Sequence, residues 1–431
     1  MLLIGVVLWF VIGIYKLNVL FKDKHKSINI FLSFFLTISL LSFSYVLILF
    51  TGLNFMVYQI LFTIIPFVFC VYKFRDFKSS LTLSTTLKTK ELVLFLASII
   101  GFTVLFFLSS NRWGDWDAWA IWSLHAKFLT HHTDFTLLFS ENISWTHPDY
   151  PLMLPSIIGS IWKSLTRESA LVPAFVAYII SLTFLLTIFA SLRELKLNRL
   201  SIVVLLIFCF TNILVPFGNS QYADTLLSLF IVLPILLQNH LNTENFKPYI
   251  FLIGFFAASC CWIKNEGIVC FLIFSMLFLF YNFKKKKHLL YFSFGAFIPL
   301  LFVIYFKIRY APSTDLIAES EDNSLLQLFD SDRYIFILKY IVKNITSAYS
   351  LIIVLIGLAL IFNRNYFKSF AFKLLTCLLL AYFFVYVLTP KNLEWHLDTS
   401  LTRLLHHIFP VLIYTIIISF GKMKNLFYLK T

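Results

Sequence analysis

The sequence predicts an all-α, polytopic integral membrane protein. Of its 431 residues, 60% are hydrophobic and only 13% are charged, which is about half the charged share of a soluble protein. Apolar runs of roughly 20 residues, the length that crosses a bilayer as a helix, recur along the whole chain. No long polar stretch separates them, so we expect no separate soluble domain.

The apolar runs predict about thirteen transmembrane helices. A shorter run at 151–166 begins with Pro151 and Pro155, and we expect it to form an interfacial or re-entrant helix. This divides the chain into extra membrane helices over 1–90, a membrane module over 91–420 and a cytoplasmic tail over 421–431. The expected crossings are 1–20, 28–50, 53–72, 91–109, 170–190, 200–216, 224–238, 248–263, 267–283, 289–308, 336–362, 369–388 and 401–420.

The net charge of +14 is explained by topology. Basic residues such as those of Lys284–Lys287 gather in alternate loops, and such loops stay on the cytoplasmic side of a membrane. We therefore expect a multi-pass protein of the inner (cytoplasmic) membrane, with its N-terminus outside and a basic surface that faces lipid headgroups, not nucleic acid. The loops 110–168 and 309–335, the second rich in acidic residues, are expected on the outer side.

The most unusual stretch is 111–127, which follows the predicted helix at 91–109. It places Asp115 and Asp117 among four tryptophans, a residue type that favours the membrane–water boundary. A carboxylate at the mouth of an apolar pocket can act as a general base, and two such groups can bind a divalent cation. The alternative is that Asp117 only caps a helix. The tryptophans are Trp113, Trp116, Trp119 and Trp122.

The predicted topology places further ionisable residues on the outer side, near the ends of membrane helices. Such groups are costly at membrane depth and often mark function. Basic groups among them could bind a lipid phosphate, whereas ion pairing, capping or snorkelling toward the interface would explain them without function. They are His147, Asp149, Asp224, Lys264, Glu266, Arg309, His396 and Arg403.

Four short motifs, in this order, resemble those of the GT-C glycosyltransferases, and most closely the bacterial protein-mannosyltransferase and aminoarabinose-transferase branch. Each is short, and they cover about 90–410. Ala118 stands where that family carries a second acidic residue, so the partner carboxylate is Asp115 or comes from elsewhere. The motifs are Asp117-Ala-Trp-Ala-Ile-Trp122, His147-Pro-Asp-Tyr-Pro-Leu152, Lys264-Asn-Glu-Gly267 and Arg403-Leu-Leu-His-His-Ile-Phe-Pro410.

The resemblance implies a GT-C-like fold that transfers a hexose or pentose, with inversion, from a polyprenyl-phosphate donor to a lipid, glycan or protein acceptor outside the membrane. Asp117 would be the base, with Asp115 as its partner or as the base itself. A divalent cation at these two residues stays an option. His147, Asp149, Asp224 and Glu266 would orient the acceptor or a cation. The donor phosphate would be bound by Lys264, Arg403, Arg309 and His396.

Two other function classes fit the same composition. A polysaccharide polymerase or ligase would use a diphosphate-linked glycan and depend more on arginines than on Asp117. A transporter or flippase would carry charged residues midway through its helices, whereas this sequence keeps most of them near helix ends.

Overall fold

The computed structural model describes residues 1–22, 25–73, 76, 87–131, 135–210, 214–241, 244–313, 324–348, 350–362 and 364–428. Within these residues the chain is helical and contains no strand. Eight of the described helices are long and apolar enough to cross a membrane, as expected of a polytopic membrane protein. They are α1 (Leu2–Leu20), α2 (Lys26–Thr51), α3 (Phe55–Tyr72), α5 (Thr89–Ser109), α8 (Leu171–Glu194), α14 (Lys286–Arg309), α18 (Phe370–Leu388) and α19 (Leu393–Tyr428).

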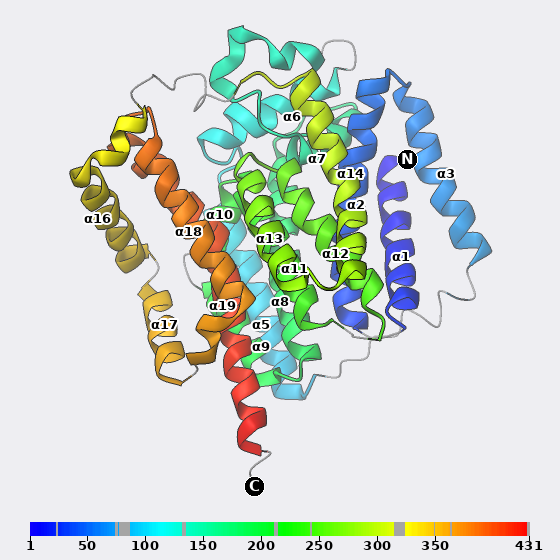
Figure 1. Cartoon of the computed structure of the whole chain (residues 1–431). Helices are drawn as coiled ribbons and strands as arrows, with labels where there is room; N and C mark the ends of the chain where they lie inside the picture. Colours follow the sequence, from blue (N-terminus) through cyan, green and yellow to red (C-terminus); the bar gives the residue numbers. More distant parts are fainter. Residues whose placement is uncertain are drawn as a thin grey trace.

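Four shorter apolar helices lie between these long ones, at or near positions where the sequence predicts crossings. Figure 1 shows α11, α12 and α13 in the middle of the bundle, and the two termini toward opposite ends of it. The all-helical membrane architecture is therefore confirmed, and the total of thirteen crossings stays a prediction. The shorter helices are α9 (Asn198–Phe210), α11 (Ala223–Asn239), α12 (Phe246–Ser259) and α13 (Glu266–Asn282).

Three predicted segments differ from the structure. The crossing expected at 336–362 is described as α16 (Ser331–Ala348) and α17 (Ser350–Phe362), and residue 349 between them lies outside the described ranges. The helix expected at 200–216 ends at Phe210, and α10 (Val215–Asn219) is separate.

The third difference concerns α19. It begins eight residues before the predicted 401–420 crossing, where the Asn392 side chain caps it by accepting a hydrogen bond from the Trp395 backbone N–H at 3.0 Å. At its other end α19 continues to Tyr428. The segment 421–431, expected to be a tail, is therefore helical for most of its length.

Close backbone contacts hold the centre of the bundle together. A Cβ added at Gly254 of α12 would lie 2.1 Å from the Phe292 carbonyl oxygen, and one at Gly295 of α14 would lie 1.9 Å from that of Phe251. Small residues that let helix backbones approach in this way are typical of membrane helix interfaces. The pair fixes the end of α12, from which the short helix η4 (Cys260–Trp262) leads to Lys264.

The loop 110–168 folds into short helices over one end of the bundle, which Figure 1 shows around α6 and α7. The expected short helix at 151–166 is present as α7; its 13 residues span about 20 Å, less than the roughly 30 Å hydrocarbon core. Of the acidic loop 309–335, residues 314–323 lie outside the described ranges. The short helices of the loop 110–168 are η1 (Ala118–Ser123), α6 (Leu124–Thr130), η2 (Phe135–Phe139), η3 (Glu141–Thr146) and α7 (Met153–Leu165). Two further short helices, η5 (Ser324–Phe329) and η6 (Arg364–Lys368), lie later in the chain.

Candidate active site

Asp224 is the centre of a cluster of charged residues. It lies in the first turn of α11 and its side chain is fully buried. Its Oδ1 contacts Lys264 Nζ at 3.0 Å and His407 Nε2 at 2.9 Å, and its Oδ2 contacts an Arg403 nitrogen at 3.2 Å. A buried carboxylate is tolerated only when it is paired and hydrogen-bonded. Asp224 thus joins α11, α19 and the segment before α13 in one ionic contact.

Arg403 connects this buried carboxylate to a second one, Asp117. The guanidinium NH2 nitrogen of Arg403 lies 2.7 Å from Asp117 Oδ2, and the guanidinium carbon lies 4.6 Å from the centre of the Tyr222 ring. The side chains of Arg403 and Asp117 are 20% and 12% exposed, whereas that of Asp224 is 0% exposed. Arg403 and Asp117 therefore form the accessible edge of the cluster.

The chain path around 111–117 separates Asp117 from Asp115. Gly114 has φ +68°, and a Cβ there would lie 2.7 Å from the Ser220 carbonyl oxygen, so this turn requires glycine. The backbone N–H of Asp115 donates to that carbonyl at 3.2 Å, while the Asp115 side chain is exposed. Asp117 directly precedes η1, a π-helical turn of a type often found at functional sites.

Lys264 and Glu266 complete the cluster from the turn between η4 and α13. Lys264 Nζ lies 3.0 Å from Glu266 Oε1 and 5.9 Å from the centre of the Tyr150 ring. The Lys264 side chain is 1% exposed and that of Glu266 is 25% exposed. Lys264 therefore pairs with two carboxylates, and the second oxygen of Glu266, Oε2, is buried without a hydrogen-bond partner among the described residues.

Asp149 belongs to a second network that fixes the same turn. Asn265 donates to Asp149 Oδ2 at 2.5 Å, and Lys307 Nζ donates both to the Asp149 carbonyl oxygen and to Asn265 Oδ1, each at 2.7 Å. Asp149 is 2% exposed. It thus anchors the 147–151 segment to α14, and its side chain does not face an open site.

The first cluster contains three carboxylates, those of Asp117, Asp224 and Glu266, and three basic side chains, those of Lys264, Arg403 and His407. The phenols nearby stay protonated. Burial, and then the negative charge of Asp117, raise the pKa of Tyr222 to about 12, and burial raises the pKa of Tyr150 well above its usual value. Both hydroxyls can therefore donate hydrogen bonds to an incoming anion.

The tryptophans of the 111–127 stretch do not share one environment. Trp116 and Trp119 are about half exposed and pack against each other at 5.9 Å between ring centres, and Trp145 joins them 6.2 Å from Trp116. Trp122 is fully buried and stacks on Tyr150 at 5.6 Å. The exposed indoles form an aromatic patch beside Asp117, and Trp122 is part of the core.

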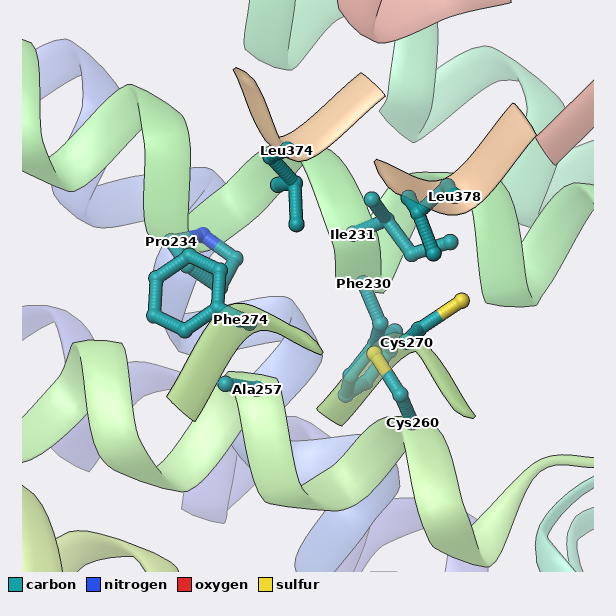
Figure 2. A pocket seen from close by; sticks show the side chains of 9 residues that line it. All are labelled: Phe230, Ile231, Pro234, Ala257, Cys260, Cys270, Phe274, Leu374 and Leu378. Atoms are coloured by element: carbon teal, nitrogen blue, oxygen red, sulfur yellow. The ribbon is translucent and has the colours of Figure 1, made fainter. Parts of the chain in front are cut away.

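A small apolar cavity lies deeper in the bundle and is lined from α11, α12, η4, α13 and α18. Figure 2 shows Leu374 and Leu378 reaching it from α18, and the sulfur atoms of two cysteines beside it. One of these, Cys270, lies 3.5 Å from the Tyr382 hydroxyl, which in turn lies 3.3 Å from His407 Nδ1. A short polar relay thus connects the cavity to Asp224. The cavity is lined by Phe230, Ile231, Pro234, Ala257, Cys260, Cys270, Phe274, Leu374 and Leu378.

Comparison with family models, with curated proteins and with solved structures finds no match to this chain. The resemblance to GT-C glycosyltransferases therefore stays a prediction, and function has to be inferred from the site itself.

The structure brings Asp117, Asp224, Lys264, Glu266 and Arg403 together, as the sequence predicts. Asp224 and Lys264 are buried, and each is paired with oppositely charged groups of the cluster. Their expected roles in orienting the acceptor and binding the donor phosphate stay predictions.

Several other predicted site residues lie apart from this cluster. Asp115 and Arg309 are exposed, and His396 Nδ1 is hydrogen-bonded to the Thr389 hydroxyl at 2.9 Å. His147, with φ +53°, stacks on Tyr150 at 5.1 Å and so lies beside the cluster. Among the described residues, neither Asp115 nor Asp117 belongs to a group of three possible metal ligands.

Sequence reasoning missed several residues of the two networks. His407 lies four positions after Arg403 and so on the same face of α19, a spacing that could have indicated it. Lys307 likewise lies close to the predicted Arg309, one half-turn earlier on α14. Tyr222 and Asn265 lie close in sequence to Asp224 and Lys264, and no sequence pattern indicated that they belong to the networks.

Proposed function

We propose that this chain is a membrane glycosyltransferase that moves a sugar from a polyprenyl-phosphate donor to an acceptor hydroxyl, with inversion, at the outer face of the cytoplasmic membrane. Asp117 is the general base. The observation that carries the proposal is the sharing of Arg403 between the accessible Asp117 and the buried Asp224. This sharing supports the proposal, because a carboxylate that can act as a base and a guanidinium that can bind phosphate lie together, next to an aromatic patch that suits a membrane boundary.

Binding of the donor phosphate would change the partner of Arg403. A guanidinium binds phosphate oxygens through paired hydrogen bonds, and the cluster contains no excess of positive charge to hold a second anion beside Asp117. The phosphate therefore replaces Asp117 at Arg403. The carboxylate that is released faces the reacting sugar and is free to accept a proton. In this way the base becomes active only when the donor is present.

Asp224 and Lys264 act as positioning residues. Asp224 fixes the guanidinium from behind at 3.2 Å and is itself fixed by Lys264 and His407. Because these bonds are buried, the guanidinium is held in one orientation before the donor arrives, which is the condition for effective charge stabilisation in a transition state.

The isoprenoid part of the donor needs an apolar environment near the cluster. On α13, Cys270 and Phe274 line the apolar cavity and lie four and eight residues after Glu266, on the same helix face. On α18, Leu378 lines the cavity four residues before Tyr382, whose hydroxyl contacts His407. The cavity therefore marks an apolar face of the bundle one to two helical turns from the charged cluster, and the lipid chain of the donor would pack along this face.

The reaction follows from these positions. Asp117 accepts the proton of the acceptor hydroxyl as its oxygen forms a bond to the anomeric carbon, on the face opposite the phosphate. The bond from that carbon to the phosphate oxygen breaks, and its electron pair leaves with the phosphate. Arg403 stabilises the charge that develops on this oxygen. The products are the glycosylated acceptor and polyprenyl phosphate.

The test uses purified full-length protein in liposomes with polyprenyl phosphates that carry hexoses or pentoses, and measures release of polyprenyl phosphate. Asp117→Asn is expected to lower turnover by roughly 10²–10⁴-fold, the usual contribution of a general base. Asp115→Asn is the matched control, since its side chain is exposed and outside the cluster, and should keep wild-type turnover. Full turnover in Asp117→Asn would refute the mechanism, and consumption of diphosphate-linked glycans alone would favour a polymerase or ligase.

A further inference from the structure

A group of three metal-ligand residues lies at the other end of α11 from Asp224. His25 is the residue before α2, Glu194 ends α8, and His240 follows α11. One ligand atom from each lies within 4.8 Å of the other two, and this is the one such group of three or more His, Cys, Asp or Glu in the described ranges. The three residues come from distant parts of the sequence.

The hydrogen bonds around Glu194 leave one of its oxygens directed at His25. Glu194 Oε1 accepts from the backbone N–H groups of Ser27 and Ile28 at 2.9 and 3.1 Å, in the first turn of α2. Its Oε2 lies 2.8 Å from His25 Nδ1. The carboxylate is thus fixed by its first oxygen, and the second is in a position to bind a cation.

His240 provides a separate indication of a ligand. Its side chain is more than nine-tenths buried, at 6% exposure, and its ring lies 4.8 Å from that of His25. Its Nε2 is hydrogen-bonded to the Ser191 hydroxyl at 2.9 Å, whereas its Nδ1 has no hydrogen-bond partner in the described part of the chain. A buried ring nitrogen without a partner is costly, and metal binding would satisfy it.

The Ser191 contact resembles the outer support that metal-binding histidines need. An imidazole that donates its N–H to a neighbouring oxygen has its other nitrogen fixed as a lone-pair donor. The Ser191 hydroxyl also lies 2.6 Å from that of Tyr414 on α19. Nearby, the Tyr249 hydroxyl is buried and lacks a partner among the described residues, and its ring lies 6.1 Å from His25.

We propose that His25, Glu194 and His240 bind a divalent first-row transition metal ion, with His240 coordinating through Nδ1. Two imidazoles and a carboxylate are the donor set that zinc and iron prefer over magnesium or calcium. Three protein ligands leave one position for a water molecule. The ion would link α2, α8 and α11 at the end of the bundle away from the Asp117 cluster.

The test measures metal content in full-length protein purified in detergent through a tag that contains no histidine. We expect about one zinc or iron ion per chain by elemental analysis, as in other sites with three or four protein ligands. His240→Gln and Glu194→Gln should lose it. The matched control is His131→Gln, because His131 also lies near a glutamate, Glu168 at 3.6 Å, but has no third ligand within the described residues.

Two further measurements keep the test informative if a variant folds poorly. Co²⁺ added to metal-free wild-type protein should give visible absorption bands of a four-coordinate nitrogen and oxygen site, and Ser191→Ala should weaken Co²⁺ binding by roughly 10-fold. Wild-type protein that contains no metal and gives no such bands with Co²⁺ or thermal shift with Zn²⁺ would overturn the proposal.

Discussion

The two ends of α11 show two ways of burying polar groups. Asp224, at the start of the helix, has three partners, and each of its oxygens is bonded. His240, just after its end, has one ring nitrogen bonded and the other without a partner in the described residues. At the first end the Asp224 carboxylate is thus fully paired, so an incoming anion must displace an existing partner of Arg403, whereas Glu266 Oε2 in the same cluster is buried without a hydrogen-bond partner among the described residues. The second end is incomplete and fits an added cation.

The largest effect on stability is expected from breaking the first end. Asp224→Ala leaves Lys264 and Arg403 buried without their shared carboxylate, and breaking a buried ion pair typically costs about 3–5 kcal/mol. At the second end, Glu194→Gln keeps an oxygen for the α2 backbone N–H groups and should cost about 1–3 kcal/mol. Chemical unfolding in detergent measures both free energies. Equal losses at the two ends would contradict this comparison.

A smaller effect on stability should follow from adding a side chain at Gly267, in the first turn of α13, next to Lys264 and Glu266. A Cβ on Gly267 would lie 1.9 Å from the Cys260 carbonyl oxygen, whereas one on Gly357 of α17 meets nothing within 4 Å. Gly267→Ala should therefore destabilise the protein by about 1–3 kcal/mol and lower turnover. Gly357→Ala, also within a helix, is the control and should be neutral or slightly stabilising. The comparison fails if both variants unfold at the same temperature.

The smallest expected effect is a pH dependence of stability that arises from His125, in the loop 110–168. Burial lowers the pKa of His125 to about 3, well below the usual value for histidine. Below about pH 6.5 the unfolded chain takes up a proton that the folded chain does not, so stability falls as the pH falls. Between pH 7 and pH 5.5 this amounts to about 1 kcal/mol.

His125→Gln isolates this contribution. Glutamine can still donate to the Thr146 carbonyl oxygen, which His125 Nε2 contacts at 2.9 Å, but it does not titrate. The variant should lose less stability than the wild type over the same pH range, measured by thermal unfolding. An identical pH dependence of the two proteins would contradict the assignment to His125.

The sequence was sufficient to predict an all-helical membrane architecture, because hydrophobic length identifies membrane helices. It also indicated the residues that meet in the cluster, because charged residues near the helix ends are few. It was not sufficient to separate Asp117 from Asp115. That difference depends on the Gly114 turn and the π-helical turn that follows. These turns leave Asp115 exposed and bury most of Asp117, although the two residues are only two positions apart.

Burial was also beyond sequence reasoning. Lys264 and Arg309 both looked like phosphate-binding groups, yet one is enclosed by carboxylates and the other is exposed. The grouping of His25, Glu194 and His240 depends likewise on contacts between distant segments. No local pattern of residues encodes such contacts.

The central claim is that the donor phosphate displaces Asp117 from Arg403. It is tested most directly by measuring the affinity of polyprenyl phosphate, without sugar, for wild-type protein, Asp117→Asn and Asp115→Asn. Removing the charge of Asp117 frees Arg403, so Asp117→Asn should bind the lipid phosphate more tightly while it turns over more slowly, and Asp115→Asn should change neither. If Asp117→Asn binds polyprenyl phosphate no better than the wild type, the two groups do not compete for Arg403 and the account is wrong.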